Sequence, residues 1–225
     1  CLRCVRGIEV NDDTLSFEAI KDVCLNGPGH YLGHDQTLSV MESEYVYPSI
    51  SDRSSPKEWN ENGRPEILDN AMDEAVAGHA NRIDFILESA TTLTIRDNGR
   101  GMPTGKHPRF PEKSAVEVIM TTLHAGGKFS GKTYATSGGL HGVGASVVNA
   151  LSSALTVEIA REKMLYRQQF SRGLPLTALE EIGTASNRRG TAVTFTPDIE
   201  IFDDNAKFRA ATLFRLARSK AYLFA

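Results

Sequence analysis

The sequence lacks the features that would place it in a membrane or in an oxidising compartment. No stretch of the 225 residues approaches the ~18 consecutive apolar residues that a transmembrane helix needs, and the opening CLRCVRGIEVNDD has no apolar secretory run. Only three residues are cysteine, which argues against a disulfide framework. We therefore expect a soluble, cytoplasmic protein with no membrane partner.

The sequence also lacks an excess of charge of either sign. It has 25 basic and 28 acidic residues, which give a formal net charge of -3. A domain that grips DNA phosphates usually carries a basic field, so any role on nucleic acid should be indirect. With 40% hydrophobic and 24% charged residues, the chain has the composition of an ordinary globular protein.

A zinc site is one interpretation of the few cysteines. Cys1 and Cys4 form a C-x-x-C pair, followed by Cys24, His30 and His34. Thiolates and imidazoles suit zinc, but a second cysteine pair is missing and the two histidines occupy a glycine-rich turn. The spacing therefore favours no metal.

The organisation of the chain changes near residue 65. Residues 1–65 contain one expected helix over 14–24 and are otherwise rich in turn-forming residues. After that point the periodicity predicts helices over 66–78, 113–124, 142–152 and 206–224, and strands over 81–87, 92–96, 154–160, 164–171 and 190–196. This order predicts an α+β sandwich, with helices on one face of a mainly antiparallel sheet.

The segment EILDNAMDEA, which begins at Glu66, has an acidic side and an apolar side at helical spacing. The simplest interpretation is that the acidic side only faces water. Asn70 argues for more, because asparagine is a poor residue for a helix interior. A carboxylate at position 66 and a carboxamide one turn later, at position 70, could hold a water molecule and a hard cation such as Mg²⁺ side by side.

The segment TIRDNGRGMP delivers Asp97 from an apolar strand into a glycine turn. It could be a simple turn in which Asp97 and Asn98 bond locally. The functional alternative places Asp97 in a pocket, with Gly99 and Gly101 allowing the backbone to approach a flat ligand. The motif alone does not decide between the two.

Residues 125–144, AGGKFSGKTYATSGGLHGVG, hold seven of the 19 glycines and run into an expected helix. A glycine loop at a helix N-terminus favours anions, and phosphate in particular. GGKFSGKT, residues 126–133, fits the P-loop pattern, but a helix rather than a strand is expected before it. A dinucleotide-binding fingerprint at Gly139, Gly142 and Gly144 fails for the same reason.

The stretch from residue 66 to 225 resembles the nucleotide-binding domain of B subunits of bacterial type II topoisomerases, namely topoisomerase IV and gyrase, in the GHKL ATPase superfamily. Five motifs match in order: EILDNAMDEAVAGH, RDNGRGMPTGKHP, EVIMTTLHAGGKF, SGGLHGVGASVVNALS and RRGTAVTFTPD. The resemblance implies an ATP site in which Glu66 activates the attacking water, Asn70 holds Mg²⁺, Asp97 receives the adenine amino group and Thr191 supports adenine through water.

The same resemblance implies further contacts to the nucleotide. The turn at Gly101, Met102 and Pro103 would line the adenine site. A lid over the phosphates would include the side chains of Lys128 and Tyr134 and the backbone at Leu140, His141, Gly142, Val143 and Gly144. In the full-length family the partners would be DNA, the topoisomerase A subunit and a second B subunit.

Residues 1–65 resemble instead the C-terminal end of the trimethylamine methyltransferase family, through RGIEVNDDTLSFEAIKDV, GPGHYLGHDQTLSVMESEYVYPSISDRSSPKEW and NENGRPEIL. We therefore expect an apparent fusion of a methyltransferase-family fragment, residues 1–65, with a nucleotide-binding domain, residues 66–225, truncated at both ends. We expect weak ATP or ADP binding with slow or absent hydrolysis, and no complete active enzyme from this chain alone. The alternatives are a non-functional fusion, a methyltransferase-family protein, or an interaction module formed by the first segment.

Overall fold

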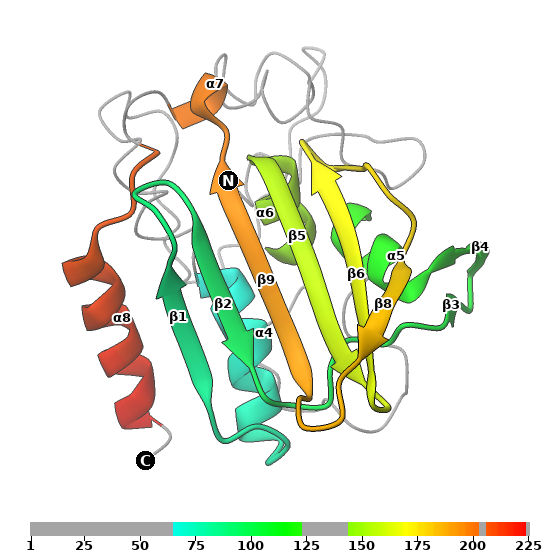
Figure 1. Cartoon of the computed structure of the whole chain (residues 1–225). Coiled ribbons are helices and arrows are strands. Elements are labelled where there is room, and N and C mark those ends of the chain that lie inside the picture. Colours follow the sequence, from blue (N-terminus) through cyan, green and yellow to red (C-terminus); the bar gives the residue numbers. More distant parts are fainter. Residues whose placement is uncertain (1–64, 123–143, 203–205, 224–225) are drawn as a thin grey trace, which may run out of the picture.

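The computed structural model describes residues 65–122, 144–202 and 206–223, which form one sheet with helices packed on it (Figure 1). The helix expected over 14–24, and the rest of residues 1–64, lie outside the described residues. Within them the fold is α+β, as the sequence predicted.

The main sheet has seven strands, and every pairing in it is antiparallel. Its path runs β1 (Ile83–Leu87), β2 (Leu93–Asp97), β9 (Gly190–Pro197), β5 (Ser152–Arg161), β6 (Met164–Ser171) and β7 (Leu174–Pro175), and β8 (Glu180–Thr184) also pairs with β6. β9, the last strand in sequence, is therefore inserted between β2 and β5, and this brings the ends of β2 and β9 together.

Three helices cover one face of this sheet: α4 (Pro65–Val76), α5 (Ala115–Thr121) and α6 (Gly144–Ala150) (Figure 1). The core lies between the two layers and joins Leu68 of α4 and Val148 of α6 to alternate strand residues such as Ile95, Ile159 and Phe195. The alternation arises because successive strand residues point to opposite faces of a sheet. The expected apolar side of α4 is confirmed, since Ile67, Leu68, Ala71 and Met72 are all buried.

A fourth long helix, α8 (Ala210–Leu223), lies beside the edge strand β1 (Figure 1). The chain enters it through Phe208, whose ring packs edge-on against Phe195 at 5.7 Å between centroids. Lys220 of α8 also binds Asp69 of α4, with 2.8 Å between Nζ and Oδ1. The acidic side of α4 therefore does more than face water.

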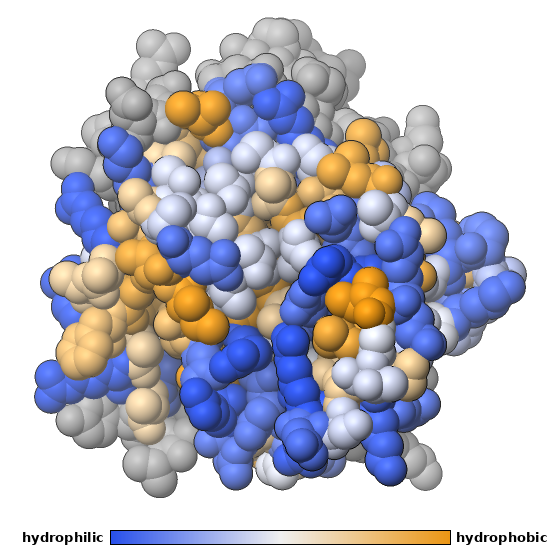
Figure 2. Space-filling view, viewed as in Figure 1, coloured by the Kyte–Doolittle hydropathy of each residue, from blue (hydrophilic) through white to orange (hydrophobic). Residues whose placement is uncertain are grey.

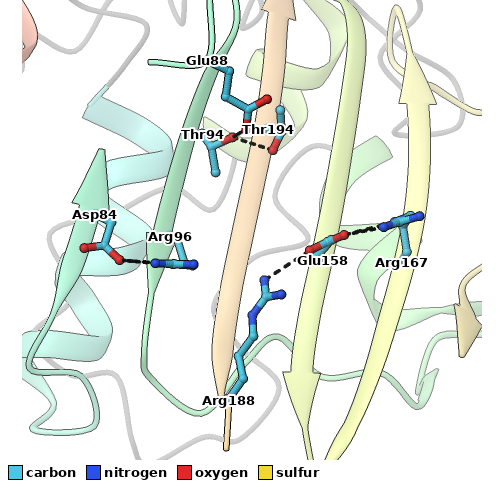
Figure 3. Close-up of polar contacts among 8 residues, drawn as sticks. All are labelled: Asp84, Glu88, Thr94, Arg96, Glu158, Arg167, Arg188 and Thr194. Atoms are coloured by element: carbon cyan, nitrogen blue, oxygen red, sulfur yellow. Dashed lines mark hydrogen bonds and ion pairs between the residues drawn. The ribbon is translucent and has the colours of Figure 1, made fainter. Parts of the chain in front are cut away.

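No described helix covers the opposite face of the sheet, which is mainly polar, with apolar patches toward its two sides (Figure 2). Two charged pairs and a threonine pair cross its strands: Asp84 with Arg96, Glu158 with Arg167, and Thr94 with Thr194 (Figure 3). The alternation of β2 and β9 thus gives an apolar helix side and a hydrophilic open side. None of the described helices is long and apolar enough to cross a membrane.

Several predicted element bounds differ from the observed ones by two to four residues. The helix expected over 113–124 begins only at Ala115, because Ser114 caps it by accepting a hydrogen bond from the Glu117 N–H at 3.0 Å. A short hairpin, β3 (Lys106–His107) and β4 (Phe110–Ser114), precedes it. The hairpin, β7, β8 and α7 (Ile199–Phe202) were not predicted, since each is short and has no clear period.

Candidate functional site

The site predicted from the sequence lies where β2 and β9 end side by side. In β2, Leu93, Ile95 and Asp97 alternate with Thr94 and Arg96, whose side chains pair on the open face, so Asp97 points to the helix side. In β9 the same alternation places Thr191 on the helix side with Val193 and Phe195. Because Arg96 pairs with Ala192, the next pair along the ladder is Asp97 and Thr191.

Asp97 is a buried carboxylate with only 8% of its surface exposed. It accepts a hydrogen bond from the Gly99 N–H at 2.7 Å and another from the backbone of Thr191. Burial raises the pKa of Asp97, and the nearby Glu74 carboxylate adds to the rise, although the backbone hydrogen bonds oppose it. A buried carboxylate with a perturbed pKa at the end of a strand is typical of a binding site.

Thr191 ties the chain after β2 to β9. Its backbone bonds Asp97, while its hydroxyl oxygen accepts a hydrogen bond from the Met102 N–H at 3.0 Å. Arg161 at the end of β5 donates to the Gly101 carbonyl at 2.9 Å. The turn Gly101–Pro103 is therefore held against the sheet by side chains from two strands.

An ion pair between Glu74 and Arg100 connects α4 to the same turn. The Arg100 guanidinium donates to both carboxylate oxygens of Glu74, at 2.7 and 3.2 Å, and the Arg100 N–H adds a third bond at 2.9 Å. Both side chains are partly buried. Such a forked pair fixes orientation as well as distance, so the loop after Asp97 has a defined position relative to α4.

The glycines of this turn are required by the packing of the protein itself. A Cβ on Gly99 would lie 2.7 Å from a Glu74 oxygen and 2.9 Å from an Asp97 oxygen. A Cβ on Gly101, where φ is +79°, would lie 3.1 Å from the Ala160 carbonyl. The protein's own close packing thus requires both glycines, and the expectation that they serve the approach of a ligand is not needed to explain them.

The remaining predicted residues lie partly outside the described part of the chain. Glu66 lies in the first turn of α4, and Asn70 is exposed one turn later on the same helix. Gly144 begins α6 and is buried. Lys128, Tyr134, Leu140, His141, Gly142 and Val143, as well as the P-loop-like residues 126–133, lie outside the described residues.

Magnesium was predicted to bind at Asn70. Within residues 65–122, 144–202 and 206–223, no group of three or more His, Cys, Asp or Glu side chains is placed to hold a metal ion. That finding does not exclude Mg²⁺, because this ion is commonly held by one or two protein oxygens together with substrate phosphates and water. The exposed carboxamide of Asn70 suits that mode.

Sequence reasoning missed four residues that build the site: Glu74, Arg100, Arg161 and Gly190. Glu74 could have been predicted as a site residue, because it stands four residues after Asn70 on the same side of α4. Gly190 could not have been predicted, because a lone glycine before a strand has many explanations. Its backbone lies so close to β2 that a Cβ there would fall 2.1 Å from the Asp97 carbonyl oxygen.

Two family models match this chain. The family described as histidine kinase-, DNA gyrase B-, and HSP90-like ATPase matches residues 65–201, and trimethylamine methyltransferase (MTTB) matches residues 1–79. The matches overlap over residues 65–79, which include all of α4. Both resemblances inferred from the motifs are thereby confirmed.

Curated relatives and a solved structure agree with the first match. The chain is 62% identical over 159 residues to the B subunit of DNA topoisomerase 4 from Bartonella bacilliformis, covering 71% of this chain and 23% of the relative. It is 48% identical over 200 residues to the Caulobacter vibrioides protein of that name, covering 88% and 29%. The B subunit of DNA gyrase from Halalkalibacterium halodurans is 51% identical over 158 residues, covering 70% and 24%.

The fold has a counterpart in a crystal structure of the 43K ATPase domain of Thermus thermophilus gyrase B in complex with an aminocoumarin. The TM-score is 0.62 and the sequence identity 43%, over 72% of this chain and 40% of that one. This likeness confirms the α+β class with a mainly antiparallel sheet. The chain spans less than a third of the length of the curated relatives it matches.

Proposed function

The chain belongs to the family of histidine kinase-, DNA gyrase B- and HSP90-like ATPases, and we propose that residues 66–225 bind ATP at the helix-side ends of β2 and β9, as the nucleotide-binding domain of a bacterial topoisomerase IV or gyrase B subunit. The observation that carries the proposal is the buried Asp97 carboxylate, held between the Gly99 and Thr191 N–H groups. A carboxylate kept in place by neutral backbone donors is suited to accept hydrogen bonds from a neutral ligand.

Asp97 would receive the exocyclic amino group of adenine. Its two backbone hydrogen bonds orient the carboxylate before a ligand arrives, so little ordering remains to be done on binding. Thr191, whose hydroxyl already accepts from Met102, would support the adenine through water. Gly101, Met102 and Pro103 would line the base.

The phosphates would lie toward α4 and the N-terminus of α6. Mg²⁺, when bound, would neutralise charge on the phosphate oxygens, with Asn70 as its protein ligand. Glu66, one turn before Asn70, would accept the proton of the attacking water. Lys128, Tyr134 and the backbone of residues 140–144 would close over the phosphates.

The wider activity follows from the relatives. The matched B subunits are named as parts of DNA topoisomerase 4 and DNA gyrase. We propose that this chain, in the cytoplasm, acts on DNA only through a larger assembly with an A subunit and a second B subunit. Nucleotide binding is expected to be weak, and hydrolysis slow or absent, from this chain alone.

A second candidate function rests on the methyltransferase match to residues 1–79. We propose a division of the chain into a methyltransferase-family segment, residues 1–65, and the nucleotide-binding domain. The shared residues 65–79 include α4, which packs in the core of the second part through Ile67 and Leu68. That packing favours assigning the overlap to the nucleotide-binding domain.

Isothermal titration of the whole chain with a non-hydrolysable ATP analogue and Mg²⁺ tests the proposal. We expect a weak exothermic isotherm and an upward shift of the melting temperature with ligand, because a ligand that binds only the folded state stabilises it. A cooperative melt with neither heat nor shift would refute ATP binding. The absence of any cooperative melt would support a non-functional fusion instead.

A further inference from the structure

A polar cleft lies on the open side of the sheet, at the same strand ends that hold Asp97 on the helix side. Its volume is about 580 Å³, and it is formed by the loop before β1, the end of β2, the β5–β6 turn and the loop between β8 and β9. The last two segments are joined by a hydrogen bond from the Ala185 N–H to the Lys163 carbonyl at 2.7 Å. Figure 2 shows hydrophilic side chains gathered over this lower part of the face.

Positive charge exceeds negative charge in the cleft lining, which holds the basic residues Arg82, Arg96, Lys163, Arg188 and Arg189 and the acidic residues Asp84, Asp97 and Glu162. Glu162 also pairs with Arg161, at 3.4 Å. Asp84 forms ion pairs with both Arg82 and Arg96, each with 2.7 Å between nitrogen and oxygen. Glu158, beside the cleft, likewise forms ion pairs with both Arg167 and Arg188 (Figure 3). Each carboxylate thus neutralises half of the positive charge that it contacts.

These carboxylates remain charged, so the excess is not offset by protonation. Burial opposes ionisation of Asp84, but the hydrogen bonds from Arg82 and Arg96 outweigh it and hold the pKa of Asp84 below its usual value. The pKa of Glu158 is lowered in the same way by Arg167 and Arg188. At neutral pH these four guanidinium groups carry four positive charges and the two carboxylates carry two negative charges, so a net charge of two positive units remains.

Two further cations of the cleft have no acidic partner among the described residues. Lys163 is exposed in the tight turn between β5 and β6, where its φ is +65°. Arg189 is exposed and makes a single described side-chain contact, to the His79 carbonyl at 3.2 Å. Both belong to the lining of the cleft, together with Ser186 and Asn187, which can donate further hydrogen bonds.

We propose that this cleft binds a compact polyanion that carries clustered phosphate groups, such as a polyphosphate or a multiply phosphorylated small molecule. Guanidinium forks match phosphate oxygens in pairs, and here several face one concavity of the size of a small-molecule site. Among the described residues, no aromatic or large aliphatic side chain lines the cleft, so a base or ring would find no surface on which to stack. That composition favours a compact anion over a nucleoside.

The cleft is separate from the proposed ATP site. By the alternation of β2, Asp97 points to the helix side. Arg96 of β2 and Asp84 of β1 pair on the open side (Figure 3). The two sites share a wall at Asp97 and Asn98, where Gly190 packs directly against the β2 backbone. Because neither side depends on the other for its ligand contacts, the cleft can be tested whether or not ATP binds.

Isothermal titration of the whole chain with inorganic tripolyphosphate, repeated with a saturating non-hydrolysable ATP analogue, tests the proposal. The test variant is Lys163→Gln with Arg189→Gln, which removes two cleft charges that hold no ion pair among the described residues. The matched control is Lys207→Gln with Arg209→Gln, which removes two exposed charges outside the cleft lining. Melting curves establish first that both double variants fold.

We expect tripolyphosphate to bind the parent chain with or without the ATP analogue and to weaken as salt is added. The cleft variant should lose about tenfold or more in affinity, as two charge-assisted contacts disappear, while the control variant should not change. Equal losses in the two variants, complete displacement by the ATP analogue, or no binding would overturn the proposal. Binding of a short DNA duplex without binding of tripolyphosphate would also overturn it, in favour of a nucleic-acid surface.

Discussion

Asp97 and Thr191 are neighbours on adjacent antiparallel strands, and the backbone of Thr191 donates a hydrogen bond to the Asp97 carboxylate. The pair forms because β9, late in the sequence, enters the sheet between β2 and β5. Two residues that are 94 positions apart in the sequence thus lie together on the helix side, at neighbouring ends of β2 and β9. Substitutions at Asp97, Thr191 and their contacts test the role of this pair.

Asp97→Asn should abolish nucleotide binding without harming the fold. The amide keeps an oxygen for the Gly99 and Thr191 N–H groups, but it places an NH₂ where adenine would need an acceptor. We expect an affinity loss of about ten- to a hundredfold, since hydrogen bonds to charged groups are worth ~1.5–3 kcal/mol. Titration with a non-hydrolysable ATP analogue measures it, and unchanged affinity would refute the adenine assignment.

The same variant should change the dependence of stability on pH. The pKa of Asp97 is higher in the folded than in the unfolded chain, so the folded state binds more protons between the two values. The contribution of Asp97 to the unfolding free energy of the parent therefore falls as pH rises through that interval. The carboxamide of the variant does not titrate, so its denaturant melts should lack this fall and, above the interval, show at least the parent's stability.

Thr191→Val should lower stability by about 1 kcal/mol, because it leaves the half-buried Met102 N–H without its acceptor. The matched control is Thr191→Ser, which keeps the hydroxyl and should stay near the parent. Urea melts measure the difference. If valine and serine behave alike, the hydrogen bond to Met102 does not support the turn.

Much of the fold could be predicted from the sequence because the long elements have clear periods. α4 and strands β1, β2, β5, β6 and β9 were placed within a few residues of their bounds, since alternation and helical spacing are strong there. The hairpin β3–β4 was not predicted, and its last two residues were placed in the helix expected over 113–124, although Ser114 and Glu117 have the spacing of a capping box. Short β7 and β8 depend on pairing with β6, which no local pattern reveals.

Asp97 and Thr191 of the candidate site could be predicted from the sequence, but the residues that hold them in place could not. Asp97 and Thr191 stand in motifs with a recognised pattern. Arg161 and Gly190 act through contacts that exist only after β5 and β9 pair, so their sequence neighbourhood is uninformative. The same holds for the cationic cleft, whose basic side chains come from separate segments of a chain with net charge -3.

Gly190→Ala should destabilise the fold by about 3 kcal/mol or more. The new methyl carbon would lie 2.1 Å from the Asp97 carbonyl oxygen and 2.8 Å from the Asn98 Cα, and φ is +104°. The control is Gly105→Ala, where no heavy atom lies within 4 Å, and its effect should stay within about 0.5 kcal/mol. Denaturant melts compare them, and equal stability of the two variants would contradict the close approach of β9 to β2.

The Glu74–Arg100 pair should contribute more than an ordinary surface pair. A double-mutant cycle with Glu74→Gln and Arg100→Gln should give a coupling free energy of about 1–2 kcal/mol, because the pair is forked, partly buried and reinforced by the Arg100 N–H. The same cycle on Lys113 and Glu117, separated by 3.6 Å, should give about 0.3–0.5 kcal/mol. Because the pair fixes the loop after Asp97, Arg100→Gln should also weaken the ATP analogue, whereas Lys113→Gln should not. Equal coupling in the two cycles would mean that the loop after Asp97 is positioned by its contacts to Thr191 and Arg161 alone.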